Sequence, residues 1–362
     1  MDALRMIAAN RVDHEWLTDA FAEESRTLAE GEVASRHHFI PVFYLRRWAI
    51  DGLVKAVDVD TGRAKRPLPP KSLAFERDLY TLPDDDETTD LPLRWVETHL
   101  SRIEDTCSRH IEDLVEGDTG LVVDDAAKAD LAVFLGLQIS RTVDARRRTL
   151  AIVNTPDSVK RRFLPAIAPT ATAAQISHSM NDQLPDPKHE AIRVMLADVR
   201  NVTASTLLKR LWTMYETQAP LVTCDEPVVA IAGPPRPRNA FIASGYSAVI
   251  AYPLSPNRVL VMFHPDLQPP SPFTLDTSET EALNQEIVAS SAKTAFERPV
   301  DEIIENSAVP PRPPYEEPDY TNLDDSETIR LLLASATPRN RWIPAENPPT
   351  WPVDRWYTRP SI

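Results

Sequence analysis

The longest regular pattern of hydrophobic positions lies in the middle of the chain. Between Leu93 and Leu114 apolar residues recur every three or four positions, and this spacing predicts one amphipathic helix. A second long helix is predicted from Asp124 to about Arg148, because an aspartate able to cap a helix precedes another apolar stripe. The same periodicity predicts further helices from about Asp13 and over residues 158–167, 171–180, 187–217 and 277–295.

Elsewhere the hydrophobic period shortens to two, which is typical of strands. Residues 53–68 predict a β-hairpin that turns at Asp60, Thr61 and Gly62. After Pro220, short β-branched runs at residues 221–224, 227–233, 246–254 and 258–265 predict further strands. The predicted fold class is therefore α+β: a mainly helical body with an N-terminal β-hairpin and a small, mostly antiparallel sheet.

Proline distinguishes the C-terminal part of the chain. Residues 306–362 hold 11 of the 34 prolines, together with Trp342, Trp351 and Trp356. A flexible linker does not require three tryptophans, whose large apolar rings favour burial. We therefore expect this tail to dock on the body in extended form. The predicted organisation is an N-terminal helical extension over residues 1–34, an α+β domain over 35–305 and a docked tail over 306–362.

Composition and charge narrow the class of protein. The 362 residues include 54 acidic and 39 basic side chains, a formal net charge of −15, so any nucleic-acid site must be a local basic patch. Two cysteines are too few for a disulfide framework, which fits a reducing compartment. No apolar run is long enough to span a membrane and the N-terminus lacks a signal-peptide pattern, so we expect a cytoplasmic protein with no membrane association. The eight glycines form no phosphate-binding loop, and no common nucleophile or zinc motif occurs.

Four sequence blocks resemble one bacterial family. They are RHHFIPVFYLRRWA at 36–49, FERDLY at 75–80, TCDEPVV at 223–229 and YPLSPNRVLVMF at 252–263. In this order they resemble a domain-of-unknown-function family, number four-two-three-eight, over roughly residues 35–305. The chain departs from that family at Cys224, where serine is usual, and at Glu226, where asparagine is common. The resemblance implies undefined biochemistry, in a family where some members look like single-gene defence factors against phage.

The first block supplies three candidate site residues. His38 matches the family's histidine, and because imidazole titrates near neutral pH it is a candidate general base or metal ligand. Its alternative role is structural, as an anchor of the hairpin to a backbone carbonyl. Tyr44 and Arg46 are candidates for binding an anion. The guanidinium group of Arg46 is of a kind that suits carboxylates and phosphates. Pairing of Arg46 with an acidic side chain is the alternative.

Two later segments supply the other candidates. Gln138 and Arg141 continue an apolar stripe of the second predicted helix, and a buried arginine needs a partner. That partner is either a core carboxylate, for example Asp225, or a ligand anion in a pocket. Asp225 lies at a strand end, a common position for catalytic carboxylates and also for turn caps. We expect catalytic roles for His38, Asp225 and Gln138 around a cleft in which Arg141 binds the anion.

Three charged patterns each fit a functional and a purely structural interpretation. Glu97 and Glu104 lie on nearly the same side of the first long helix, where they either hold a divalent cation or simply flank the helix in solvent. A basic island within residues 141–162 is either a phosphate-backbone footprint or a solvated helix end. The acidic run at 83–90 resembles the Mg²⁺-diphosphate motif of terpene synthases, but the prolines on both sides predict an exposed loop.

The function that these patterns favour is a bacterial defence-type effector, a nuclease-like hydrolase that acts on a phosphate-bearing substrate, either nucleic acid or nucleotide. One alternative is a non-catalytic sensor or binding protein that uses the same anion-binding pocket. A remote alternative is a terpene-synthase-like prenyl diphosphate cyclase. The only cofactor suggested is a divalent cation, Mg²⁺ or Mn²⁺, and the patterns leave the oligomeric state open.

Overall fold

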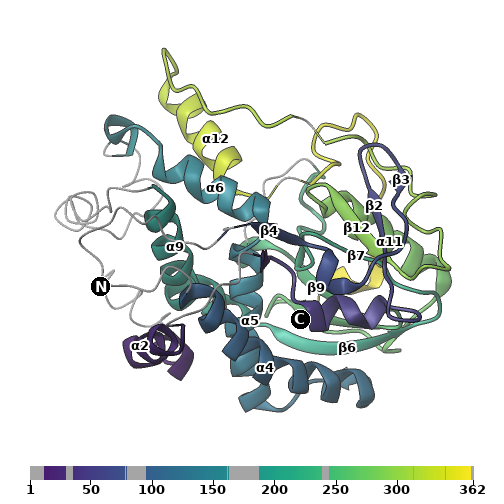
Figure 1. Cartoon of the computed structure of the whole chain (residues 1–362). Helices are drawn as coiled ribbons and strands as arrows, with labels where there is room; N and C mark the ends of the chain where they lie inside the picture. The colour runs from purple at the N-terminus through teal and green to yellow at the C-terminus, as the bar shows by residue number, and fades with distance from the viewer. Residues whose placement is uncertain are drawn as a thin grey trace.

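Helices α4, α5, α6 and α9 gather on one side of the molecule, and strands with helix α11 gather on the other (Figure 1). The structure is a computed structural model that describes residues 12–29, 36–77, 79, 95–160, 162, 187–238, 244–312, 314–338 and 340–359. Its α-helices are α2 (Asp19–Leu28), α3 (Val42–Leu45), α4 (Trp95–Glu116), α5 (Asp125–Ser140), α6 (Val143–Val153), α9 (Pro187–Asp198), α10 (Ala204–Leu208), α11 (Thr277–Ser290) and α12 (Asp325–Ala336). Shorter helical turns are η1 (Glu15–Leu17), η2 (Arg46–Trp48), η3 (Pro70–Ser72), the π-type η4 (Val199–Thr203), η5 (Ser244–Tyr246) and η6 (Asp354–Tyr357).

The strands form three sheets, which confirms the α+β class. They are β1 (Arg36–His38), β2 (Lys55–Asp58), β3 (Arg63–Ala64), β4 (Phe75–Arg77), β5 (Gly120–Leu121), β6 (Leu211–Thr217), β7 (Thr223–Cys224), β8 (Val229–Ile231), β9 (Val249–Ser255), β10 (Arg258–Phe263), β11 (Thr274–Leu275) and β12 (Thr294–Glu297). The main sheet has the order β11-β6-β10-β9-β8, with β5 also paired to β6. A second sheet has the order β3-β2-β12-β7, and β1 pairs only with β4.

The main sheet is buried on both faces. Alternate residues of β10 enter two different hydrophobic clusters: Leu260 and Met262 pack with the long helices, while Val259, Val261 and Phe263 pack with α11 and the C-terminal tail. A strand that is covered on both sides needs apolar residues throughout, which explains the uninterrupted apolar runs of β9 and β10. The sheet is therefore the middle layer of three.

The helix predicted from Asp124 to about Arg148 is in fact two helices. Asp124 caps α5 as expected, accepting hydrogen bonds from two backbone N–H groups. The chain then breaks, and Thr142 begins α6 by accepting a hydrogen bond from the N–H of Ala145. A threonine that caps in this way adopts extended backbone angles and cannot continue the preceding helix. The break turns α6 away and leaves Arg141 at the corner.

Other boundaries also differ from those predicted. The helix predicted over 187–217 ends at Leu208, and Leu211–Thr217 is strand β6, in which four consecutive residues are buried between two layers. The helix predicted over 277–295 ends at Ser290, after which β12 begins. The helix predicted over 171–180 lies outside the described residues, as does most of the one predicted over 158–167.

The hairpin at 53–68 has the predicted turn, since β2 pairs antiparallel with β3 and Gly62 has a positive φ of 63°. The C-terminal tail is less extended than expected, because it contains α12, which packs against α6 (Figure 1). Asp324 begins α12 in a reciprocal capping arrangement with Glu327. Further on, Trp356 is fully buried with its ring 5.6 Å from that of Tyr215, so the tail forms part of the core.

Candidate functional site

The two-stranded sheet β1–β4 presents a basic face beside His38. Residues two apart on a strand share a face, so Arg36 lies on the same face as His38, and Arg77 on the same face as Phe75. Arg36 and Arg77 are directly opposite each other in the register, and both are exposed. Like charges in opposed positions repel, and neither arginine has a carboxylate partner within the described part of the chain. This pair is therefore a place where an anion is favoured.

His38 is partly buried between this basic face and helix α4. Its Nε2 lies 3.3 Å from the backbone carbonyl oxygen of Lys71, and its ring lies 5.9 Å from that of Phe75. Burial lowers the pKa of His38 below its usual 6.5, more than the carbonyl of Lys71 and the charge of Glu104 raise it. The imidazole is therefore neutral at pH 7 and able to accept a proton. The neighbouring His37 points to the opposite side and is fully buried.

Glu97 on α4 lies next to His38. Its carboxyl group faces the backbone N–H of His38, which favours the ionised form and so opposes the rise in the pKa of Glu97. Burial, together with the nearby charge of Glu104, raises the pKa of Glu97 to about 7. A carboxyl group with this pKa is protonated in a large fraction of molecules at neutral pH, so it is able to act as a general acid.

Arg141 pairs with Glu104 and not with Asp225. Its Nη1 lies 2.6 Å from Oε1 of Glu104, and its Nε and Nη2 both donate to the side-chain oxygen of Gln138, at 2.9 and 2.7 Å. Gln138 in turn donates to the backbone carbonyl of Phe39, next to His38. Because Arg141 is only 1% exposed, it holds Glu104 and Gln138 in place and is not open to solvent. His38, Glu97, Glu104, Gln138 and Arg141 form what we call the acid–base cluster.

Asp225 lies in a different neighbourhood. Its carboxylate accepts hydrogen bonds from the backbone N–H groups of Ala292, Lys293 and Thr294, at 2.7 to 2.8 Å. These bonds fasten the end of β7 to the loop that leads into β12. Asp225 is therefore occupied by a structural contact with a distant loop, and not with its own turn, and the structure does not bring it to His38.

Tyr44 and Arg46 also separate from the cluster. Tyr44 is fully buried, and its hydroxyl contacts the hydroxyl of Thr223 at 2.7 Å and the carbonyl of Pro253 at 2.8 Å. These contacts occupy the hydroxyl group within the core. Arg46, on η2, is exposed to solvent.

The basic island of residues 141–162 is largely neutralised by acidic neighbours. Asp144 alone receives the guanidinium groups of Arg147, Arg148 and Arg312. Arg162 pairs with Asp325 of the tail. The acidic run at 83–90, on which the comparison with terpene synthases depends, lies outside the described residues.

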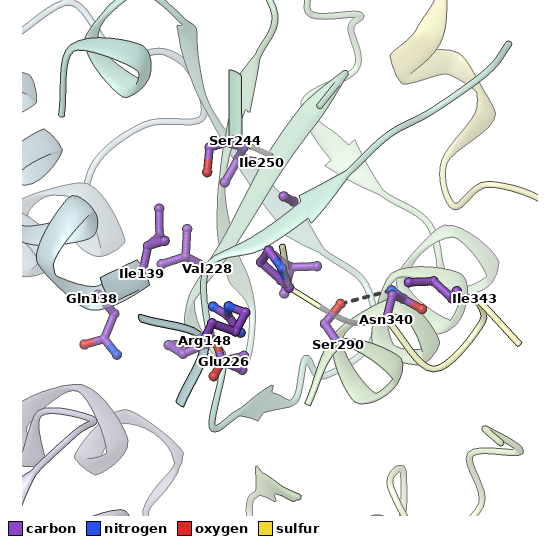
Figure 2. Close-up of a pocket in the computed structure, with 14 residues that line it drawn as sticks. Gln138, Ile139, Arg148, Glu226, Val228, Ser244, Ile250, Ser290, Asn340 and Ile343 are labelled. Atoms are coloured by element: carbon purple, nitrogen blue, oxygen red, sulfur yellow. Dashed lines mark hydrogen bonds between the residues drawn. The ribbon is translucent and has the colours of Figure 1, made fainter. Parts of the chain in front are cut away.

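A cavity with a volume of about 50 Å³ adjoins the acid–base cluster, and Gln138 contributes to both. Figure 2 shows Arg148 and Glu226 together in the middle of its lining, with Gln138 and Ile139 on one side and Ser290, Asn340 and Ile343 on the other. We call it the Arg148 cavity. Its wall therefore comes from α5, α6, the β7–β8 turn, α11 and the tail.

Arg36 and Arg77 were not among the site residues predicted from the sequence. Arg36 begins the first family-like block and Arg77 lies within the second, and their opposition depends on the pairing of β1 with β4 across a gap of about forty residues. A signal was present, since each lies two residues from an aromatic or histidine side chain in a short extended run. The register that joins the two runs was not readable from sequence.

No three histidine, cysteine or acidic side chains of the described residues group as metal ligands. Nor does any helix among them combine the length and apolar character needed to cross a bilayer.

Comparison with known proteins gives one match. A family model described as a protein of unknown function (DUF4238) matches residues 36–301. The matched region contains every member of the acid–base cluster, and it excludes helix α2 and the tail. No curated protein and no solved structure matches the chain.

Proposed function

This chain belongs to the DUF4238 family of proteins of unknown function, and we propose that it is a bacterial defence-type effector that hydrolyses a phosphate-bearing substrate, nucleic acid or nucleotide. The observation that carries the proposal is the acid–base cluster beside an opposed pair of exposed arginines. A neutral imidazole and a carboxyl group of pKa about 7 belong to residues that meet at the backbone N–H of His38, on segments about sixty residues apart. Two titratable groups tuned in this way are typical of catalytic acid–base pairs.

In the proposed reaction each group has a distinct role. Arg36 and Arg77 hold the phosphate, because two opposed guanidinium groups gain most from an anion between them. The neutral imidazole of His38 accepts a proton from the attacking water, and protonated Glu97 donates a proton to the leaving oxygen. Arg141 acts through Glu104 and Gln138, which it positions, and does not touch the substrate.

The proposal is tested by hydrolysis assays on the full-length protein. Labelled RNA, DNA and nucleotides are incubated with wild type, His38→Ala and Glu97→Gln, with and without Mg²⁺ or Mn²⁺. We expect the two variants to lower the hydrolysis rate by about 100-fold or more, as removal of a general acid or base does. Glu116→Gln, an exposed glutamate on the same helix α4, is the matched control and is expected to retain full activity.

The alternative, a non-catalytic sensor, predicts a different outcome from the same samples. If every substrate stays intact while wild type still binds one of them and Arg36→Ser with Arg77→Ser abolishes the binding, the site is a receptor. Intact substrates without binding would contradict both functions. Loss of phage protection in cells that carry His38→Ala, compared with wild type, tests the defence role.

A further inference from the structure

Two opposite charges face the Arg148 cavity without touching each other. Arg148 is about nine-tenths buried, and its Nη1 donates a hydrogen bond to the carboxylate of Asp144. Glu226 is partly exposed to the cavity, and its Oε1 accepts a hydrogen bond of 2.5 Å from the hydroxyl of Thr142. Within the described part of the chain these are the only hydrogen bonds of the two side chains, and no nitrogen of Arg148 lies within 4.0 Å of a carboxylate oxygen of Glu226.

The two charges nevertheless interact across the cavity. Burial lowers the pKa of Arg148, and the charge of Glu226 opposes that shift. Burial raises the pKa of Glu226, and the charge of Arg148 is the largest effect that opposes it. A nearby but unjoined pair leaves unused donors on the guanidinium and an unused acceptor on the carboxylate. A group that accepts from one side and donates to the other satisfies both.

The rest of the cavity favours a flat ring over a simple anion. Its remaining wall is mainly aliphatic, with Ile139, Val228 and Ile343 among the lining residues. A phosphate in this position would meet the carboxylate of Glu226 and be repelled. The cavity volume of about 50 Å³ admits the edge of a ring but not a whole nucleotide. Aliphatic walls around a donor–acceptor pair are the surroundings in which proteins read the edge of an unstacked base.

We propose that the Arg148 cavity is a nucleobase subsite, in which a guanine-type edge offers its carbonyl oxygen to Arg148 and its N–H groups to Glu226. Guanine fits best because O6 accepts from an arginine while N1–H and N2–H donate together to one carboxylate. This inference rests on the proposed function, whose substrate it narrows to a nucleotide or nucleic acid.

The position of Gln138 joins the subsite to the acid–base cluster. Its side chain lines the cavity, and the same side chain contacts Arg141 and the carbonyl beside His38. A base in the cavity therefore lies one side chain away from the proposed catalytic groups. The tail supplies the outer wall through Pro338, Asn340 and Ile343, which lie beyond the family-matched region, so this chain carries part of its specificity outside that region.

The test measures binding of guanosine, which has no phosphate, to the full-length protein by calorimetry, with ribose 5-phosphate as the probe that lacks a base. Glu226→Gln retains an acceptor for Thr142 but replaces the acceptor that faces the base, and we expect it to weaken guanosine binding about tenfold or more. Ile343→Trp fills the cavity from the tail and is expected to abolish binding. Glu281→Gln, an exposed glutamate on α11, is the matched control and leaves binding unchanged.

Failure of this inference is distinguishable from failure of the proposed function. Guanosine that binds wild type and the Glu97→Gln variant equally, and Glu226→Gln weakly, supports the subsite even if no substrate is hydrolysed. Hydrolysis without measurable guanosine binding would overturn the subsite and leave the hydrolase in place. Guanosine binding that Glu226→Gln and Ile343→Trp both leave unchanged would also overturn it, because the base would then bind elsewhere and water would bridge the two charges.

Discussion

At the scale of single residues, the raised pKa of Glu97 lowers the stability of the folded protein at neutral pH. In the unfolded chain its carboxyl group ionises near pH 4.5, whereas in the folded chain the pKa is about 7. The folded state therefore binds a proton that the unfolded state releases between these values. Stability contributed by this group is complete below pH 4.5, declines as the pH rises to 7 and then stays low. A residue that lowers folding stability in this way is typical of a functional site.

Glu97→Gln is expected to stabilise the protein at pH 8 by up to about 3 kcal/mol, because glutamine has no proton to lose. At pH 4.5 the same substitution leaves the free energy of unfolding nearly unchanged, since both side chains are then neutral. Urea denaturation of wild type and variant at the two pH values measures the difference. Equal stabilities at pH 8 would show that Glu97 ionises normally in the folded state. Glu116→Gln again serves as the control.

The pH dependence of the proposed hydrolysis follows from the same two groups. Glu97 must be protonated to act as the acid, so the rate falls as the pH rises above about 7. His38 must be neutral to act as the base, so the rate falls as the pH drops through its pKa, which lies below 6.5. We expect a bell-shaped profile of kcat/KM with its maximum between these values. A profile that is still rising at pH 9 would contradict the assignment of Glu97.

At the scale of elements, the docking of α2 on α4 depends on a neutral histidine. His99 of α4 is 3% exposed, with its Nδ1 3.3 Å from the hydroxyl of Ser25 and its ring edge-on to Phe21. Burial, with the charges of Arg102 and Arg26 acting in the same direction, lowers the pKa of His99 to about 4. The folded pKa is depressed below the unfolded 6.5, so stability is lost as the pH falls from 6.5 towards 4.

We therefore expect helix α2 to detach at acidic pH before the body unfolds. Hydrogen exchange of the amides at Asp19–Leu28, measured at pH 7 and at pH 4.5 after correction for the intrinsic rate, should show lower protection at pH 4.5. His99→Gln, which stays neutral, should show the same protection at both values. Loss of protection in this variant as well would mean that another group controls the docking.

At the scale of the whole molecule, the tail is part of the second hydrophobic cluster. Trp356 is fully buried against Tyr215 and Phe263, which lie on strands β6 and β10 of the main sheet. Arg355 pairs with Glu279 at 2.7 Å, and the fully buried Arg341 pairs with Asp60 of the hairpin turn. These contacts join the tail to the main sheet and to the sheet β3-β2-β12-β7, so we expect the tail and the body to unfold together.

Trp356→Ala is expected to lower the free energy of unfolding of the whole protein by about 3 to 5 kcal/mol, because it leaves a cavity beneath the sheet. Urea denaturation followed by far-UV circular dichroism should remain a single transition with a lower midpoint. Tyr246→Ala, whose side chain is 69% exposed, is the control, with an expected change within about 0.5 kcal/mol. A separate early transition with an unchanged main midpoint would show that the tail folds independently.

The sequence alone determined those features that depend on local pattern. Hydrophobic period and capping residues predicted α4, the start of α5, the hairpin turn at Gly62 and strands β7 to β10, because each depends on neighbours only a few residues away. The same information identified the family and placed His38, Gln138 and Arg141 among the candidate residues. It also offered Asp225 as the partner of Arg141, since both are polar residues in otherwise apolar elements.

Tertiary structure alone decided which of these residues meet. The break at Thr142 leaves Arg141 facing Glu104, and the β1–β4 register opposes Arg36 to Arg77. Both arrangements join segments tens of residues apart, and charge pairing depends on distances that no local period encodes. The tail closes the Arg148 cavity for the same reason, because its place is determined by the burial of Trp356 and Arg341 in the assembled core and not by its own proline-rich sequence.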